Sequence, residues 1–336
     1  AEEQKVNIKA IILTHAHEDH FGAVPYLWEK LNVPIYGTPF TIALLKRKLE
    51  EAKISDNIPL NVIDYNVDYK FGAFTVEFVA LSHSIPDPAA IVLKTDKGQI
   101  LHTGDWKFDE TPMVGNKTDV QKLKRIGDEG VIALIGDSTN ALINGRTPSE
   151  SVAREGLTKV IASSKYTVAV TCFASNIARI SSIISAANEN NRHVCVVGRA
   201  LHRSISAARE TGYLDNIPDF VSEVDSGLMP RENLVIICTG SQGETRAAKI
   251  RNFHPGFDAG QGIEKVHLVG SRRSGLDQVG VPFAGCFPGV GNRQLPLSGF
   301  VLFQAQADRG GGNAETRRKN PVDLQGHFHG GVFLVI

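Results

Sequence analysis

The sequence has few cysteines, no net charge and no long apolar run. Its four cysteines stand singly, and Cys172, Cys195 and Cys238 lie in apolar stretches where cysteine behaves as a small hydrophobic residue. This usage argues against a disulfide scaffold and predicts a reducing, cytoplasmic location. A formal net charge of +0 gives no global sign of a nucleic-acid or membrane partner, although a local basic patch is still allowed. No apolar run approaches the roughly 20 residues of a membrane span, so no membrane contact is expected.

What the chain does have is a cluster of metal-ligand side chains at the end of an apolar run. Residues 11–13 form the run, and three histidines and an aspartate follow it within a few positions. Extended backbone turns alternate side chains to the same side, so His15 and His17 can face one pocket. Asp19 and His20 reach that pocket from a turn later. Imidazole and carboxylate ligands suit Zn²⁺ or a similar divalent ion, so the pattern predicts two ligand pairs for two metal ions.

Two further ligands are expected from distant strands, because His83 and Asp105 each follow an apolar stretch. We expect one ion on His15, His17 and His83, a second on Asp19 and His20, and Asp105 bridging both together with a hydroxide. Two divalent ions lower the pKa of a shared water and neutralise the charge that builds on a phosphoryl or acyl oxygen. The predicted chemistry is therefore two-metal hydrolysis.

The order of strands and helices predicts an α/β protein of two domains and a tail. From about Thr147, helices and strands alternate through residues 149–163, 167–171, 175–189, 193–197, 202–211 and 234–238. Alternation of this kind is typical of a parallel, Rossmann-like sheet. Beyond about Lys249 the sequence has no sustained period and reads as a non-native extension. The expected division is a metal-binding domain at 1–146, a second domain at 147–248 and a tail without readable fold at 249–336.

A glycine-containing turn closes the second domain. Gly240, Ser241 and Gln242 follow the apolar strand 234–238 and precede a helical start. Such a turn can present backbone N–H groups to a phosphate, and it can equally be a simple connection. We therefore predict these residues as contacts for a substrate phosphate, with a plain turn as the alternative.

Several strings resemble those of a known family. The run from Thr14 to Ala23 resembles the second motif of the metallo-β-lactamase fold, and His83 and Asp105 resemble its third and fourth motifs. With the strings at 103–107, 136–140 and 239–244, the chain resembles ribonuclease J, a bacterial member of the β-CASP group. The resemblance extends over about residues 6–248.

The resemblance implies an αββα metallo-β-lactamase sandwich with an inserted, Rossmann-like β-CASP domain. It also implies a metal-dependent ribonuclease with two divalent ions, Zn²⁺ or Mn²⁺, that hydrolyses phosphodiesters of single-stranded RNA. The family acts as a 5′→3′ exonuclease and an endonuclease in RNA processing and decay, and it forms dimers or tetramers. Asp137 matches the first β-CASP carboxylate, expected near the metals either to protonate the leaving oxygen or to order a ligand.

Three departures from the family pattern shape the remaining expectations. The family's leading strands have no counterpart before Ala1, so the chain is expected to be truncated there. Its later His-x-Ser-Gly-His motif is not found after Glu244, and a further histidine that completes the second metal sphere has no clear match. Two alternatives therefore stand beside the ribonuclease: a hydrolase of a small ester or thioester, and an inactive RNA-binding fragment.

Overall fold

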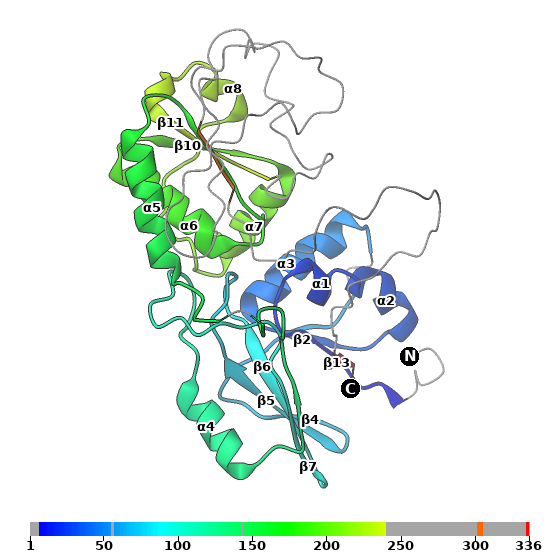
Figure 1. Ribbon diagram of the computed structural model, residues 1–336. Coiled ribbons are helices and arrows are strands. Elements are labelled where there is room, and N and C mark those ends of the chain that lie inside the picture. The colour runs from blue at the N-terminus through cyan, green and yellow to red at the C-terminus, as the bar shows by residue number, and fades with distance from the viewer. Residues whose placement is uncertain (1–6, 55–56, 143, 240–300, 305–333, 336) are drawn as a thin grey trace, which may run out of the picture.

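The structure is a computed structural model that describes residues 7–54, 57–142, 144–239, 301–304 and 334–335. These residues form two α/β parts that lie side by side (Figure 1). No helix in the described ranges combines the length and the apolarity needed to cross a membrane.

The first part contains two sheets. One has the strand order β13-β1-β2-β3, in which β1, β2 and β3 are parallel and β13 is antiparallel to β1. The other has the order β4-β5-β6-β7-β8, antiparallel except for the last pair. The strands of the first sheet are β1 (Ile11–Ile12), β2 (Ile35–Gly37), β3 (Leu60–Val62) and β13 (Leu334–Val335). Those of the second are β4 (Tyr69–Phe71), β5 (Phe74–Ala80), β6 (Ala89–Thr95), β7 (Gly98–His102) and β8 (Ala133–Ile135).

Helices cover the outer faces of both sheets. The first sheet carries α1 (Glu18–Phe21), α2 (Val24–Leu31) and α3 (Pro39–Glu51), and the second carries α4 (Val120–Glu129). Helix α3 begins at Pro39, as the Thr38-Pro39 pair predicts, because proline's fixed φ suits the first helical position.

Alternation along β1 shows how the layers arise. Ile11 packs in one buried cluster with Phe40 of α3, whereas the next residue, Ile12, packs in another with Phe78 of β5. Successive strand side chains point to opposite faces, so the first sheet is buried on both sides. The far face of the second sheet packs against Ile126 of α4. The layers are therefore helix, sheet, sheet and helix, which confirms the predicted αββα sandwich.

The second part is a parallel sheet with the strand order β10-β11-β9-β12. Its parallel arrangement agrees with the Rossmann-like pattern predicted from the alternation of helices and strands. The strands are β9 (Val168–Thr171), β10 (His193–Val197), β11 (Leu234–Cys238) and β12 (Val301–Gln304). The helices are α5 (Glu150–Ser163), α6 (Ile177–Glu189), α7 (Arg199–Glu210) and α8 (Glu223–Ser226), with a 3-10 turn at Arg231–Asn233.

Two short strands, β12 and β13, lie in the stretch 249–336 for which the sequence predicts no fold. β12 adds to the edge of the second part's sheet beside β9, and β13 adds to the edge of the first part's sheet beside β1. The rest of that stretch lies outside the described residues, as does the predicted phosphate-binding turn of Gly240, Ser241 and Gln242.

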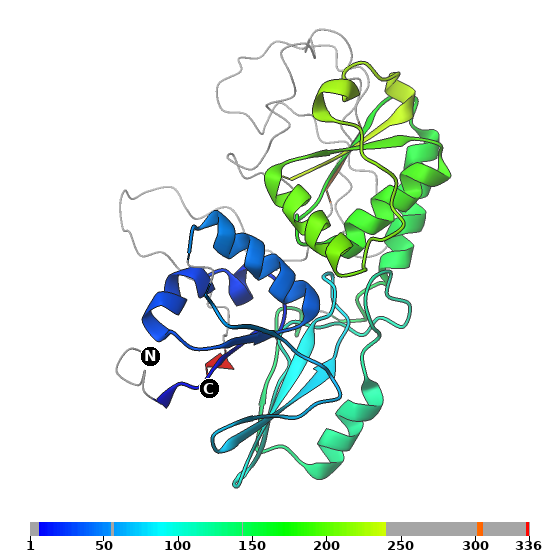
Figure 2. The same ribbon diagram turned by 180° about the vertical axis from the view of Figure 1, so that it is seen from behind.

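The two parts share a continuous apolar core. A single buried cluster runs from Phe40 and Leu44 of α3 to Ile177 of α6 and Leu201 of α7. Helices α3 and α7 face each other at the boundary, which is also visible from behind (Figure 2). At the rim of this contact, Arg47 Nη2 lies 2.5 Å from a Glu210 carboxylate oxygen. The boundary is therefore an internal packing surface of the folded chain.

Candidate metal centre

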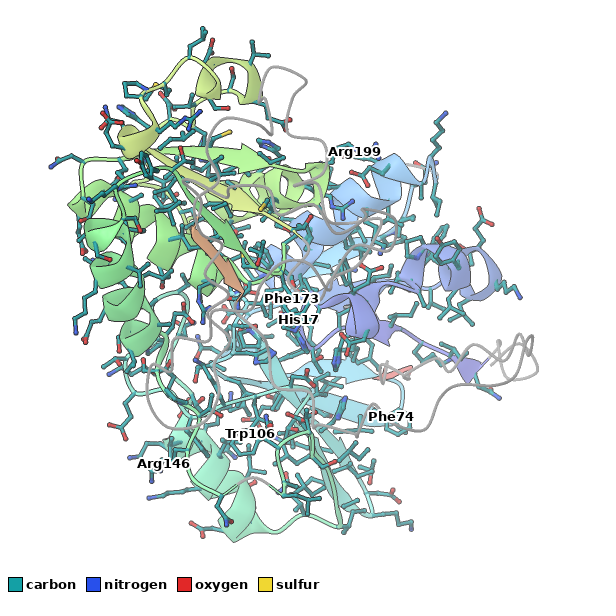
Figure 3. All side chains as sticks on the ribbon, turned by 45° about the horizontal axis from the view of Figure 1, so that its top comes forward. His17, Phe74, Trp106, Arg146, Phe173 and Arg199 are labelled. Atoms are coloured by element: carbon teal, nitrogen blue, oxygen red, sulfur yellow. The ribbon has the colours of Figure 1, made fainter. Side chains whose placement is uncertain are left out.

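The first ligand segment lies where β1 ends and α1 begins. β1 ends at Ile12, and His17, whose own backbone is extended, directly precedes the first residue of α1. The His17 carbonyl accepts hydrogen bonds from the backbone N–H groups of His20, at 2.9 Å, and Phe21, at 3.1 Å. This single helical turn brings Asp19 and His20 around to the same region as His15. The side chains at the centre lie at the boundary between the two parts, where His17 is labelled (Figure 3).

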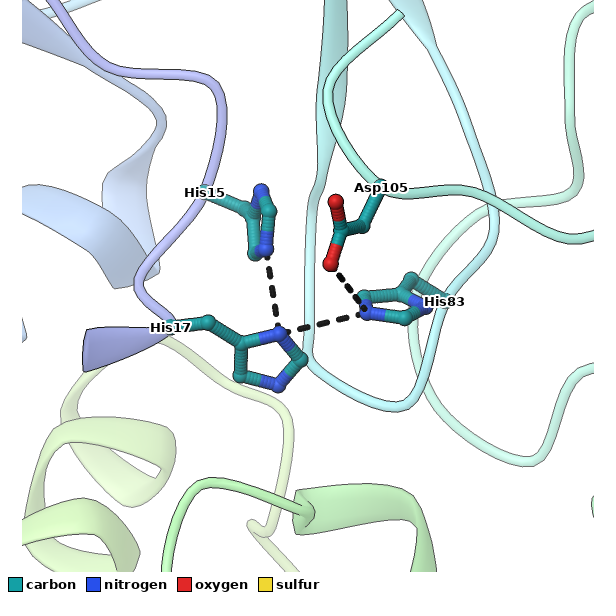
Figure 4. Close-up of side chains that lie close together, drawn as sticks. All are labelled: His15, His17, His83 and Asp105. Carbon is teal, nitrogen blue, oxygen red and sulfur yellow. Dashed lines mark hydrogen bonds and ion pairs between the residues drawn. The ribbon is translucent and has the colours of Figure 1, made fainter. Parts of the chain in front are cut away.

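Three histidines and an aspartate converge in the first group of ligand atoms. His15, His17, His83 and Asp105 each offer one ligand atom, and these atoms all lie within 4.8 Å of one another (Figure 4). His15 Nε2 lies 3.0 Å from His17 Nδ1, and His17 Nδ1 lies 3.2 Å from His83 Nε2. His83 Nε2 is 3.9 Å from Asp105 Oδ2. Three separate segments of the chain therefore supply one compact set of nitrogen and oxygen atoms.

A second group lies beside the first and shares one of its members. Asp19, His20 and Asp105 also hold their ligand atoms within 4.8 Å of one another. His20 Nε2 lies 3.2 Å from Asp105 Oδ1 and 3.6 Å from Asp19 Oδ2. Asp105 thus turns one oxygen toward each group. The structure brings together all six side chains that the sequence predicts as metal ligands.

The protonation states match what a divalent cation needs. Burial, reinforced by the neighbouring imidazoles, holds the pKa of His15 well below its ordinary value. Burial also lowers the pKa of His17, to about 4, although Asp105 and Asp19 act to raise it. Both rings are therefore neutral near pH 7, and a neutral imidazole has the lone pair that binds metal.

The carboxylate at the centre stays ionised. Burial acts to raise the pKa of Asp105, but its hydrogen bond with His20 and the charge of that ring outweigh this effect, so the pKa is lowered. Burial acts to lower the pKa of His20, but Asp105 and Asp19 outweigh this effect and raise the pKa. The neutral imidazoles of the first group and the shared carboxylate form a donor set that fits Zn²⁺ or a similar first-row ion.

Neighbouring groups orient the ligands. The second ring nitrogen of His15, Nδ1, lies 3.0 Å from the Thr14 hydroxyl, a contact that fixes the orientation of the ring. A single β-bridge between Ser82 and Lys107 joins the segment of His83 to the segment of Asp105. Contacts within the protein therefore fix the orientation of the ligand-bearing segments.

Gly104 allows the ligand segments to approach each other closely. Its φ is +58°, and a Cβ there would lie 2.9 Å from Cβ of Thr14, closer than real Cβ atoms come to one another. Only glycine fits this position without strain. Because Gly104 and Thr14 each directly precede a ligand, this contact sets how near Asp105 lies to His15.

Asp137 stands outside both ligand groups. It follows β8, and its Oδ1 accepts hydrogen bonds from the Thr139 backbone N–H at 2.8 Å and the Thr139 hydroxyl at 2.6 Å. Its charge contributes to raising the pKa of His20. Its catalytic role stays a prediction. Glu18, which lies between ligands in the sequence, pairs instead with Lys48 at the surface.

Sequence reasoning missed Asp87, four residues after His83. Its carboxylate is 1% exposed and accepts hydrogen bonds from the Phe40 backbone N–H and the Tyr213 hydroxyl. Burial raises the pKa of Asp87, and hydrogen bonds from Thr38, Phe40 and Tyr213 offset the effect only in part. The available signal was the Pro86-Asp87-Pro88 turn directly after a predicted ligand.

Comparison with known proteins defines the class. Residues 1–150 match the family profile described as the metallo-beta-lactamase superfamily. The first part of the chain, with its αββα layers and its His/Asp cluster at the ends of strands, is thus a metallo-β-lactamase domain. Residues 165–254 match the profile described as the ribonuclease J beta-CASP domain. The chain therefore combines the two domains that the sequence motifs predict.

Curated relatives carry the same identification. The chain is 45% identical over 246 residues to ribonuclease J of Sinorhizobium meliloti, a match that covers 73% of this chain and 44% of the relative. It is 39% identical to ribonuclease J 1 of Streptococcus pyogenes, with the same coverage of both chains. It is also 39% identical to ribonuclease J2 of Bacillus subtilis, over 74% of this chain and 45% of the relative. The resemblance to ribonuclease J is confirmed, and the chain spans less than half the length of these relatives.

Proposed function

We propose that this chain carries the active site of a metal-dependent ribonuclease that hydrolyses phosphodiester bonds of single-stranded RNA in RNA processing and decay. The main support is the position of Asp105 in both ligand groups, on a metallo-β-lactamase domain followed by a ribonuclease J β-CASP domain. The proposal includes 5′→3′ exonuclease and endonuclease action in the cytoplasm, and a dimer or tetramer for the longer family proteins.

The ligand groups suggest how the centre works. His15, His17 and His83 would hold one Zn²⁺ or Mn²⁺ ion, Asp19 and His20 a second, and Asp105 both. Such a pair of ions lowers the pKa of a shared water and neutralises charge on the phosphoryl oxygens.

The chain's own residues contribute orientation and charge. Asp105 stays ionised and presents one oxygen to each group, which keeps the two groups in a fixed relation. The Thr139 hydrogen bonds fix the Asp137 carboxylate on the His20 side of the centre. In this position Asp137 would either order a neighbouring group or deliver a proton to the leaving oxygen.

Cleavage of 5′-monophosphorylated RNA by the purified chain, with Zn²⁺ or Mn²⁺ supplied, tests the proposal. Labels at the two RNA ends separate 5′→3′ degradation from internal cleavage. Asp105→Asn is expected to slow cleavage by more than about 100-fold, because loss of one electrostatic group at a reacting centre costs about 10²–10³ in kcat. Intact RNA combined with hydrolysis of thioesters or lactams would refute the ribonuclease. RNA binding without turnover, with fewer than two ions bound per chain, would support the inactive fragment.

A further inference from the structure

The segment that carries His83 is held by the second part of the chain. This segment, residues 82–88, connects β5 to β6 and passes along the boundary between the two parts. The backbone N–H of Ala178, in the first turn of α6, donates to the Ser84 carbonyl at 3.3 Å. The hydroxyl of Tyr213, just after α7, donates to Asp87 Oδ2 at 3.1 Å. Two elements of the β-CASP region therefore contact one ligand-bearing segment of the metallo-β-lactamase domain.

Asp87 is the point where these contacts meet. Its Oδ2 also accepts from the backbone N–H of Phe40 at 2.9 Å, in the first turn of α3. Its backbone carbonyl accepts from the Tyr65 hydroxyl at 3.0 Å. The residue has φ of 45°, in the left-handed region that non-glycine residues rarely adopt. Such a conformation persists only where surrounding contacts hold it, and here hydrogen bonds from three separate segments do so.

The same segment touches the metal centre at its other end. His83 Nε2 lies 3.2 Å from His17 Nδ1, and the Ser84 hydroxyl lies 3.4 Å from His17 Nε2. A shift of the segment would therefore move His83 and change the surroundings of His17 together. Because His83 is only four residues from Asp87, a loss of restraint at Asp87 reaches the ligand through a short stretch of backbone.

We propose that Asp87 and Tyr213 are positioning residues, through which the β-CASP region sets the placement of His83 in the metal centre. The inference rests on the metal centre of the proposed function and is independent of the RNA substrate. Neither residue belongs to a ligand group of the described chain, so both act through the backbone of the segment.

The expected effect is a weaker and altered metal site in a folded protein. Loss of a group that supports a metal ligand costs about 10–100-fold in affinity. Because Tyr213 acts through Asp87, Tyr213→Phe is expected at the lower end, about 10-fold. Asp87→Asn changes the acceptor of the same hydrogen bonds, because it removes the charge of the side chain and keeps one oxygen acceptor.

Titration of the full chain with Co²⁺, followed by its visible d–d absorption bands, measures both affinity and ligand geometry. The matched control is Tyr26→Phe, which removes a hydroxyl from a side chain that is 78% exposed on α2. Tyr213→Phe and Asp87→Asn should weaken Co²⁺ binding and change the bands, and Tyr26→Phe should do neither. The double variant, with both substitutions, should have the Co²⁺ affinity of whichever single variant binds Co²⁺ less tightly. The two losses should not add, since the two residues act on one segment.

Urea unfolding separates positioning from simple stabilisation. Unchanged affinity and bands in Tyr213→Phe would overturn the inference even if that variant unfolded more easily. If Asp87→Asn does not fold, Tyr213→Phe, which removes only one hydroxyl, decides the question. Absence of Co²⁺ binding in the unaltered chain would overturn both the metal centre of the proposed function and this inference. Unchanged Co²⁺ binding in Tyr213→Phe would overturn this inference alone.

Discussion

Replacing the carboxylate that both ligand groups share should have a different effect from replacing one that belongs to a single group. Asp105 lies in both groups, whereas Asp19 lies only in the second, with a side chain that is 56% exposed. Asparagine keeps the shape of each side chain and removes its charge. Asp105→Asn is therefore expected to weaken both ions, and Asp19→Asn only the ion that His20 helps to hold.

The expected magnitudes follow from these positions. Loss of a supporting partner of a metal ligand costs about 10–100-fold in affinity, so loss of a direct, shared ligand should cost more than about 100-fold, or about 2.7 kcal/mol. Asp19 is largely exposed and water can replace its oxygen. Its replacement is expected at the lower end of that range, about 10-fold, and for one ion only.

Competition with a chromophoric zinc chelator, combined with elemental analysis of bound zinc per chain, measures both effects. At a free zinc concentration only just high enough to saturate the unaltered chain, Asp19→Asn should keep one ion and lose part of the second, whereas Asp105→Asn should lose most of both. Urea unfolding curves without metal serve as the control, because the comparison requires both variants to be folded. If the two variants lose the same single ion, or if Asp105→Asn keeps both, the assignment of Asp105 to two groups is refuted.

Three other sites give independent predictions. Gly104→Ala should lower the free energy of unfolding by about 2–4 kcal/mol, because left-handed backbone and a close contact both oppose a Cβ there; unchanged urea unfolding would contradict this. Burial acts to raise the pKa of Glu77, but hydrogen bonds and charge from Lys94 and Lys122 outweigh it and lower the pKa. The charged carboxylate therefore stabilises the fold at neutral pH, and this contribution is lost as the pH falls through the lowered pKa. Glu77→Gln should therefore cost about 1.5–3 kcal/mol in urea unfolding at neutral pH, and a difference that persisted in acid would refute the reasoning. Leu134 is 64% exposed on the edge strand β8, so Leu134→Lys should reduce self-association in sedimentation, and an unchanged profile would count against an adhesive edge.

The ligands could be predicted because each follows an apolar strand in the sequence. A strand end places its polar residues at one edge of a sheet, so His83 and Asp105 could be grouped with His15 despite their distance along the chain. The parallel second sheet was predictable for a similar reason, since periodicity is a local property of the sequence. The αββα layers were expected from the resemblance of the motifs to the metallo-β-lactamase fold.

Contacts between distant segments could not be predicted in this way. Asp87 and Tyr213 are 126 positions apart, and their hydrogen bond depends on how the two parts pack. The need for glycine at position 104 arises only when Thr14 lies against it. β12 and β13 are short strands whose pairing depends on partner strands elsewhere in the chain, so no periodic pattern marks them.

The apolar cluster that continues from α3 into α6 and α7 has a consequence for cooperativity. Domains joined by a polar linker can melt one after the other, whereas domains that share a core lose its packing together. The two parts of this chain are therefore expected to melt in one transition. A divalent ion that binds only the folded metal centre would then raise the melting temperature of the β-CASP region as well, although none of the six expected ligands belongs to that region.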